Sequence, residues 1–172
     1  MEKTESKNFK KMIYVGIGSN LKSKKYKNSC DVCLDAINHL KKFFKVLKIS
    51  SFYESEPVPK SDQPLFVNAV FAIYTKKNER EILEILNQIE KDFGRERSVK
   101  NESRILDLDI IDYNGKIVNN NELRIPHPRL HLRKFVLLPL YEIEPNWVHP
   151  VFNEKIPNLL RKITDIQKIK KI

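Results

Sequence analysis

The sequence is poor in cysteine, and this shortage limits the kinds of site it can form. The chain has two cysteines, Cys30 and Cys33, and no second pair that would complete a four-ligand zinc site. Both fit the apolar side of a helix together with Leu34, Ile37 and Leu40. This favours core thiols in a reducing compartment over a redox or metal-binding pair.

Long apolar runs are also missing, since no stretch approaches the roughly 18 residues that cross a bilayer. Residues 1–11 are polar and lysine-rich and lack the apolar centre of a signal peptide. We therefore expect a cytoplasmic protein without a membrane partner, a disordered tail at residues 1–11 and a basic tail at 166–172. Residues 12–165 suit a single domain, and we expect a monomer.

Two glycine-rich phosphate-binding loops are absent as well. A turn at residues 16–20 follows a strand, but neither G-x-x-x-x-G-K-[ST] nor G-x-G-x-x-G occurs in the chain. Nucleotide binding by either loop is not expected, and the turn is equally compatible with a purely structural role.

Positive charge is what the chain has in excess. Its 32 Lys and Arg against 22 Asp and Glu give a net charge of +10, which favours a nucleic acid, phosphate or membrane partner. Lysines near the chain ends and at residues 22–27 can serve solubility alone. Arginine is more informative because its planar fork binds phosphate, and arginines cluster at positions 95, 97, 104, 129 and 133.

Apolar periodicity predicts strand, helix, strand, strand, helix, strand at residues 12–18, 26–44, 46–54, 65–74, 79–93 and 105–113. This order is typical of an α+β, ferredoxin-like split βαβ fold, with a four-stranded antiparallel sheet and both helices on one face. A C-terminal extension follows, with a hairpin near 114–124 and helices near 135–144 and 156–164. The loop at 55–64 holds three prolines.

Two aspartates one residue apart, Asp107 and Asp109, lie in the apolar strand at 105–113. Side chains alternate across a strand, so both carboxylates face one side, roughly 6.6 Å apart along the strand axis. Buried like charges this close need counter-charges. Salt bridges to arginine would satisfy them, and so would Mg²⁺, which takes carboxylate and phosphate oxygens together.

A basic loop, with Arg95, Arg97, Lys100 and Arg104, comes directly before these aspartates. Direct Arg–Asp bridges are one explanation. The other is a polyphosphate with Mg²⁺ lying between the two sets of charges, so that each charge has a partner.

Two further groups complete the candidate site. His127 lies in a rigid Pro-His-Pro segment, from which it can donate to phosphate or only cap a turn. Phe66 and Asn68 share one face of the predicted third strand. An aromatic ring beside an amide suits a flat heteroaromatic ligand, although Phe66 alone is more often a core residue.

Five motifs in order carry a family resemblance: Gly18-Ser19-Asn20; Asp62-Gln63-Pro64 with Asn68; Gly94-Arg95-x-Arg97; Arg104-x-x-Asp107-Leu108-Asp109; and Pro126-His127-Pro128-Arg129. Over about residues 12–160 the chain resembles the 6-hydroxymethyl-7,8-dihydropterin pyrophosphokinase (HPPK) family of folate biosynthesis. The fold of that family is ferredoxin-like, in agreement with the element order.

The resemblance implies that ATP transfers its β,γ-diphosphoryl group to the pterin hydroxymethyl group and releases AMP. It implies two Mg²⁺ on Asp107 and Asp109, and catalytic roles for Arg95, Arg97, Arg104, Asp107 and Asp109. It implies ATP contacts from Glu90, Arg95, Arg97, Lys100, Arg104, Ile110, His127 and Arg133. It implies pterin contacts from Ser55, Pro57, Val58, Phe66, Asn68 and Phe135.

The basic loop departs from the family pattern. Glu102 stands where a small residue is usual, Lys100 stands where Arg is common, and the loop between Arg97 and Arg104 is shorter than in some relatives. Closure of this loop is therefore the least secure part of the comparison. An inactive relative kept for interaction is one alternative.

A basic RNA-binding module is the other alternative, because the RRM domain shares the split βαβ order and +10 suits RNA. The third strand lacks the K/R-G-F/Y-G/A-F run of an RRM, however, and an RRM would not bury two aspartates. No nucleic-acid partner is therefore expected.

Overall fold

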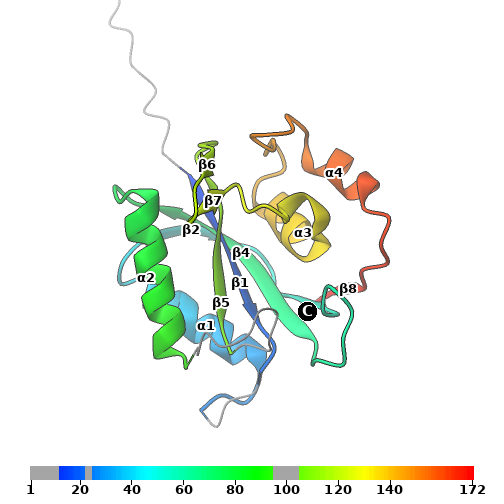
Figure 1. Cartoon of the computed structure of the whole chain (residues 1–172). Coiled ribbons are helices and arrows are strands. Elements are labelled where there is room, and N and C mark those ends of the chain that lie inside the picture. Colours follow the sequence, from blue (N-terminus) through cyan, green and yellow to red (C-terminus); the bar gives the residue numbers. More distant parts are fainter. Residues whose placement is uncertain (1–11, 22–24, 95–104) are drawn as a thin grey trace, which may run out of the picture.

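The computed structural model describes residues 12–21, 25–94 and 105–172 of the chain (Figure 1). The elements, in order, are β1 (Ile13–Ser19), α1 (Ser29–Leu40), β2 (Lys45–Ile49), β3 (Tyr53–Ser55), β4 (Phe66–Tyr74), α2 (Glu79–Asp92), β5 (Asp107–Tyr113), β6 (Val118–Asn119), β7 (Arg124–Ile125), a 3-10 turn (Leu130–Leu132), α3 (Lys134–Ile143), α4 (Ile156–Lys162) and β8 (Ile169–Lys171). The expected tail at residues 1–11 lies outside the described residues.

The main sheet has six strands rather than the four expected. Its order is β5-β1-β4-β3-β8, with β2 also paired to β4, and all pairings are antiparallel. The strand expected at 46–54 is two strands, because three residues, 50–52, lie opposite only two on β4. At this break the Ser50 hydroxyl accepts from the Val70 amide at 3.0 Å and replaces a ladder carbonyl.

Residues 166–172 are not only a basic tail, since Ile169–Lys171 form β8 and pair with β3. The strand is three residues long and carries two lysines, both features that protect an exposed sheet edge. Such a strand has too little apolar alternation to be seen in the sequence.

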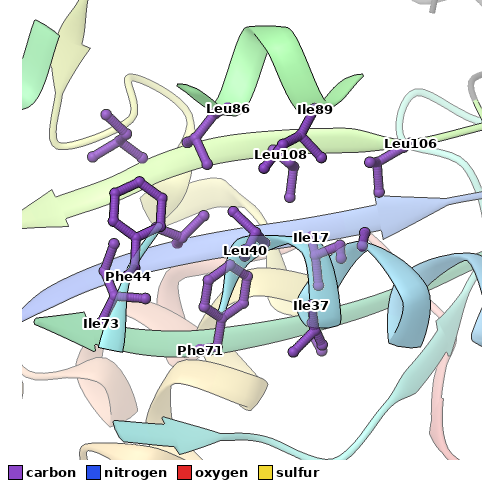
Figure 2. Packing of buried hydrophobic residues seen from close by; sticks show 14 of the residues in the cluster. Ile17, Ile37, Leu40, Phe44, Phe71, Ile73, Leu86, Ile89, Leu106 and Leu108 are labelled. Atoms are coloured by element: carbon purple, nitrogen blue, oxygen red, sulfur yellow. The ribbon is translucent and has the colours of Figure 1, made fainter. Parts of the chain in front are cut away.

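Helices α1 and α2 cover one face of the sheet. Asn28 caps α1 by accepting from the Asp31 amide at 3.0 Å, and Asn78 with Glu81 forms a capping box on α2. Figure 2 shows the buried side chains between these helices and the sheet: Ile37, Leu40, Phe44, Leu86 and Ile89 over Ile17, Phe71, Ile73, Leu106 and Leu108.

One residue departs from the expected apolar side of α1: Leu34 is 50% exposed, so its assignment to the core is wrong. Cys33 is buried and Cys30 packs against the core, both as free thiols. Burial raises the pKa of both thiols, in agreement with a structural role.

The opposite face of the sheet is covered by α3 and the segments beside it (Figure 1). Leu130, Leu137 and Leu140 pack there against Tyr14 and Ile111 of the sheet. The sheet is therefore enclosed on both faces, and the open region lies at one end of β1, β4 and β5. No helix in the described ranges combines the length and the apolar character needed to cross a membrane.

Candidate functional site

A cavity of about 270 Å³ opens at this end of the sheet. Its walls come from β1, β4 and β5, from the loop after β3, and from the segment that leads into α3. The lining residues are Gly16, Ile17, Gly18, Ser55, Glu56, Pro57, Val58, Pro59, Ser61, Gln63, Phe66, Asn68, Ala69, Asp107, Asp109, Ile111, His127, Arg129, Leu130, Arg133, Phe135 and Val136.

The floor of the cavity is the glycine pair of β1. Gly18 is paired with Asn68 on β4 and with Asp107 on β5, so the three lie in one row across the sheet. Adjacent strands are about 4.8 Å apart, which places Asn68 and Asp107 about 10 Å from each other. A Cβ at Gly18 would lie 3.3 Å from the Asn68 Oδ1, so glycine keeps this floor open.

The acidic end of the cavity is formed by Asp107 and Asp109. Both line it, whereas Leu106, Leu108 and Ile110 are buried in the core on the other face, which confirms the predicted alternation. The expectation that the pair is buried is wrong, because the Asp109 side chain is 41% exposed. Asp109 Oδ2 lies 3.9 Å from the Arg133 Nη1, a long ion pair, and 3.8 Å from the His127 Nε2.

His127 is oriented by the main chain. Its amide donates to the Ile111 carbonyl at 3.2 Å, and its Nδ1 accepts from the Arg129 amide at 3.2 Å. The ring is neutral at pH 7 because burial, with the positive charges of Arg133 and Arg129, lowers its pKa to about 4. Nδ1 accepts the shorter of two contacts from donors, 3.2 Å from the Arg129 amide against 3.5 Å between Nε2 and the Arg133 Nη1. We therefore assign the single ring proton to Nε2, which also faces Asp109.

The other end of the cavity is aromatic. Phe66 of β4 and Phe135 of α3 are both partly buried and line it. Asn68 is 6% exposed, and its Nδ2 donates to the Ser55 hydroxyl at 2.8 Å. The Arg133 guanidinium carbon lies 5.5 Å from the centre of the Phe135 ring, so Arg133 touches both ends of the cavity.

The structure thus brings together all six residues expected at the pterin, two of those expected at ATP and both expected metal ligands. The pterin residues are Ser55, Pro57, Val58, Phe66, Asn68 and Phe135, the ATP residues are His127 and Arg133, and the metal ligands are Asp107 and Asp109. Arg95, Arg97, Lys100, Glu102 and Arg104 lie outside the described residues.

Glu90 and Ile110 do not line the cavity. Ile110 is 4% exposed and points into the helix-covered core, so only its main chain can approach a ligand. Glu90 is 1% exposed and accepts from the Leu108 amide at 2.7 Å. Its carboxylate therefore holds β5 at the residue between the two aspartates.

The sequence analysis named Arg129 in the arginine cluster and in a motif but gave it no site role, and it missed the role of Gly16 and Gly18 as the floor. It quoted Asn20 and Gln63 only within motifs. Asn20 is 2% exposed and its Nδ2 donates to Gln63 Oε1 at 3.1 Å, which joins the turn after β1 to the 55–64 loop. The signal for Asn20 in the sequence was a polar residue directly after a buried strand.

Among the described residues, no three His, Cys, Asp or Glu side chains gather as a metal site.

A comparison with family models matches residues 14–145 to "7,8-dihydro-6-hydroxymethylpterin-pyrophosphokinase (HPPK)". The chain is 41% identical over 164 residues to the folic acid synthesis protein fol1 of Pneumocystis carinii, covering 95% of this chain and 22% of that protein. It therefore spans about a fifth of this relative. The match to the 2-amino-4-hydroxy-6-hydroxymethyldihydropteridine pyrophosphokinase of Haemophilus influenzae is 38% identical and covers 91% of this chain and 96% of that protein.

A crystal structure of Plasmodium falciparum HPPK-DHPS with SDX-DHP superposes with a TM-score of 0.65 and 16% identity. It covers 88% of this chain and 44% of that one, and it supports the fold. The RNA-binding alternative has no support. An RRM binds RNA on the sheet face opposite its helices, and here α3 covers that face. By the family match and these relatives, the chain belongs to the 7,8-dihydro-6-hydroxymethylpterin-pyrophosphokinase family.

Proposed function

We propose that this protein transfers the diphosphoryl group of ATP to the hydroxymethyl group of 6-hydroxymethyl-7,8-dihydropterin, with AMP and the pterin diphosphate as products. The observation that carries the proposal is a single cavity with an aromatic, amide-bearing end and an acidic end, separated by Gly18. Membership of the family supports the same reaction.

The pterin binds at the aromatic end in this proposal. Phe66 and Phe135 supply faces for a flat ring, and Asn68 reads its polar edge. Because the Asn68 Nδ2 already donates to Ser55, its Oδ1 is the atom that accepts from a pterin N–H. Pro57 and Val58 close the cavity from the side of the loop.

The ATP phosphates bind at the acidic end. Asp107 and Asp109 suit Mg²⁺, because this ion is commonly held by one or two carboxylates together with substrate phosphates. We infer two ions, on the resemblance to the family. When bound, Mg²⁺ offsets charge on the transferring group. The site also offers the Nε2–H of His127 and the guanidinium of Arg133 to phosphate oxygens.

The remaining roles rest on the sequence motifs. We propose that Arg95, Arg97, Lys100 and Arg104 grip the phosphates, and that Ile110 contributes only through its main chain. Glu90 acts on the nucleotide indirectly, by fixing the Leu108 amide between the aspartates. The attacking nucleophile is the pterin hydroxyl, so the work of the protein is binding, alignment and charge stabilisation.

We also infer the finer features of the molecule. The order β1-α1-β2/β3-β4-α2-β5 with β5-β1-β4 pairing supports a ferredoxin-like split βαβ frame, to which α3, α4 and β8 are added. We infer a cytoplasmic monomer. Light scattering at several protein concentrations tests the monomer, and a mass of about two chains would contradict it.

The test of the reaction uses the purified protein with ATP, Mg²⁺ and the hydroxymethyl dihydropterin. Nucleotide products are separated by ion-exchange chromatography. We expect AMP that forms only when the pterin is present, in a one-to-one ratio with the pterin diphosphate. Formation of ADP, or no product, would contradict the proposal.

A further inference from the structure

The C-terminal segment, residues 167–171, contacts both walls of the cavity described above. One wall is the segment 132–135, which carries Arg133 and Phe135. The other is the start of the 55–64 loop, which carries Ser55 and Pro57. These walls are far apart in the sequence, and residues 167–169 bond to each of them.

Gln167 holds the first wall with both ends of its side-chain amide. Its Nε2 donates to the Leu132 carbonyl at 2.9 Å, and its Oε1 accepts from the Lys134 amide at 3.0 Å. The two bonds therefore bracket Arg133. Among the described residues, none that follows Gln167 makes a comparable pair of bonds to this wall.

The bond to Lys134 also caps α3. The first amides of a helix have no partner within the helix, and a Ser, Thr, Asp or Asn at the N-cap usually accepts from one of them. Here Arg133 is the N-cap residue and makes no side-chain cap bond. Because Gln167 supplies an acceptor from outside the helix, position 133 is free to carry a cation that faces the cavity.

Lys168 and Ile169 hold the second wall. The Glu56 amide donates to the Lys168 carbonyl at 3.3 Å, and the Lys168 Nζ lies 3.6 Å from the Glu56 carboxylate. Ile169 pairs with Ser55 in the β3–β8 ladder. Ser55 in turn accepts from Asn68, so β8 supports the row that faces the polar edge of the pterin.

We propose that residues 167–169 are a positioning clamp that sets the distance between the two walls of the pterin end, with Gln167 as its principal positioning residue. This inference rests on the proposed function for the identity of the ligand. The clamp does not bond to Asp107 or Asp109 in any described contact. Its loss reaches ATP only through Arg133, one of several phosphate contacts proposed above, so we expect it to act on the pterin more than on ATP.

The test compares Gln167→Leu with Gln88→Leu, a matched change at an exposed position on α2 where the glutamine donates to Asp92 of the same helix. For Gln167→Leu we expect about tenfold weaker pterin binding by calorimetry, the size expected for two lost hydrogen bonds. Binding of ATP with Mg²⁺ should change less than threefold. Gln88→Leu should match the wild type in both titrations.

Gln167→Glu provides the conservative rescue. It keeps the acceptor for the Lys134 amide and places a negative charge at a helix N-terminus, but it loses the donor to Leu132. We expect pterin binding between those of the wild type and Gln167→Leu. Equal losses of pterin and ATP affinity in Gln167→Leu, or no loss of either, would overturn the clamp.

A second measurement does not depend on the ligand. Hydrogen exchange of peptides covering residues 132–136 should be faster in Gln167→Leu than in the wild type, and a chain ending at Asp165 should also show faster exchange at 55–58. Unchanged exchange in both segments would overturn the clamp even if the protein binds no pterin. Failure of the wild type to bind pterin, with faster exchange in the variants, would instead contradict only the proposed function.

Discussion

At the residue scale, the protonation state of His127 determines what it offers to a ligand. The ring is a neutral donor at pH 7, because burial and two arginines lower its pKa to about 4. A neutral donor can bind a phosphate oxygen and does not form a second ion pair with Asp109 beside that of Arg133. The chemistry at this position is therefore orientation of an oxygen rather than neutralisation of its charge.

The same pKa makes His127 a source of acid sensitivity. The folded pKa is about 4 and the unfolded value about 6.5, so the unfolded chain binds more protons between these pH values. The free energy of unfolding therefore falls as pH drops from 6.5 to 4. We expect His127→Gln to reduce this fall by about 2 to 3 kcal/mol.

Urea unfolding of the wild type and His127→Gln at pH 7 and pH 4.5 measures this effect. The pKa of His149 is also lowered by burial, but His149 is present in both proteins, so the difference reports His127. Parallel pH dependences in the two proteins would contradict the assignment.

The aspartates make the second prediction at this scale. Asp107→Asn and Asp109→Asn keep the size of each side chain but remove the charge that holds a metal ion. We expect each to reduce pterin-dependent AMP formation at least about 100-fold, a loss typical for a group that stabilises transition-state charge. Because the Asp109 side chain is 41% exposed, the melting temperature of the Asp109→Asn variant should stay near that of the wild type.

The control is Asp92→Asn, an exposed aspartate at the end of α2, which should keep full activity. Full activity in Asp107→Asn or Asp109→Asn would contradict the proposed role of the two aspartates.

That Asp107 and Asp109 share one face of β5 could be predicted from strand alternation alone. The neutral state of His127 could not, because its largest cause is burial, which depends on the folded structure and not on the local sequence.

At the element scale, β1 contributes to the site because Gly16 and Gly18 have no side chain that would fill the cavity floor. In Gly18→Ala the new Cβ would lie 3.3 Å from Asn68 Oδ1, an atom held in place through the bond to Ser55. We expect about tenfold weaker pterin binding and little change for ATP. In Gly16→Ala the nearest atom is the Ile111 Cδ1 at 3.1 Å, at the flexible end of its side chain, so the loss should be smaller.

Calorimetric titration of both glycine variants with the pterin measures this difference. An equal or larger loss of pterin affinity in Gly16→Ala would contradict the prediction that a side chain at position 18 acts by displacing Asn68.

The contact between α2 and β5 gives a second element-scale prediction. Glu90→Ala leaves the buried Leu108 amide without this acceptor, which typically costs about 1 to 3 kcal/mol. The strand segment between the two aspartates is then less well fixed. We expect weaker binding of ATP with Mg²⁺, measured by titration at a temperature where the variant is folded, and unchanged pterin affinity. Unchanged ATP affinity would contradict the indirect role.

The helices and the long strands were predictable because their apolar periodicity is local. The division of the 46–54 strand was not, since it depends on one extra residue opposite β4. The β8 strand was also not predictable, because its partner is β3, more than a hundred residues earlier. The site residues were found mainly through motifs, whereas the cavity floor required the pairing register.

At the scale of the whole molecule, the two apolar layers, one under α1 and α2 and the other under α3, pack on opposite faces of the same sheet. We therefore expect the two layers to unfold together. Trp147 is the single tryptophan and lies in the layer beneath α3, so its fluorescence reports that face, while far-ultraviolet circular dichroism reports all elements. The two urea transitions should coincide. A fluorescence transition at lower urea would show that the α3 layer opens first.

Shortening a buried side chain on either face of the sheet should then move the fluorescence and circular dichroism transitions together to lower urea concentration. Leu86→Ala on the α1/α2 side and Leu137→Ala on the α3 side each remove a fully buried side chain and should cost about 2 to 5 kcal/mol. A variant that shifts only one of the two signals would contradict a shared transition.

The row from Asn68 through Gly18 to Asp107 has a consequence for how substrate preference can change. Its length is set by backbone hydrogen bonds between strands, and this spacing is nearly the same in all sheets. Substitutions can alter the size or charge at either end but cannot move the two ends apart. An acceptor molecule whose hydroxyl stands further from its ring would therefore be rejected by length, whatever side chains surround it.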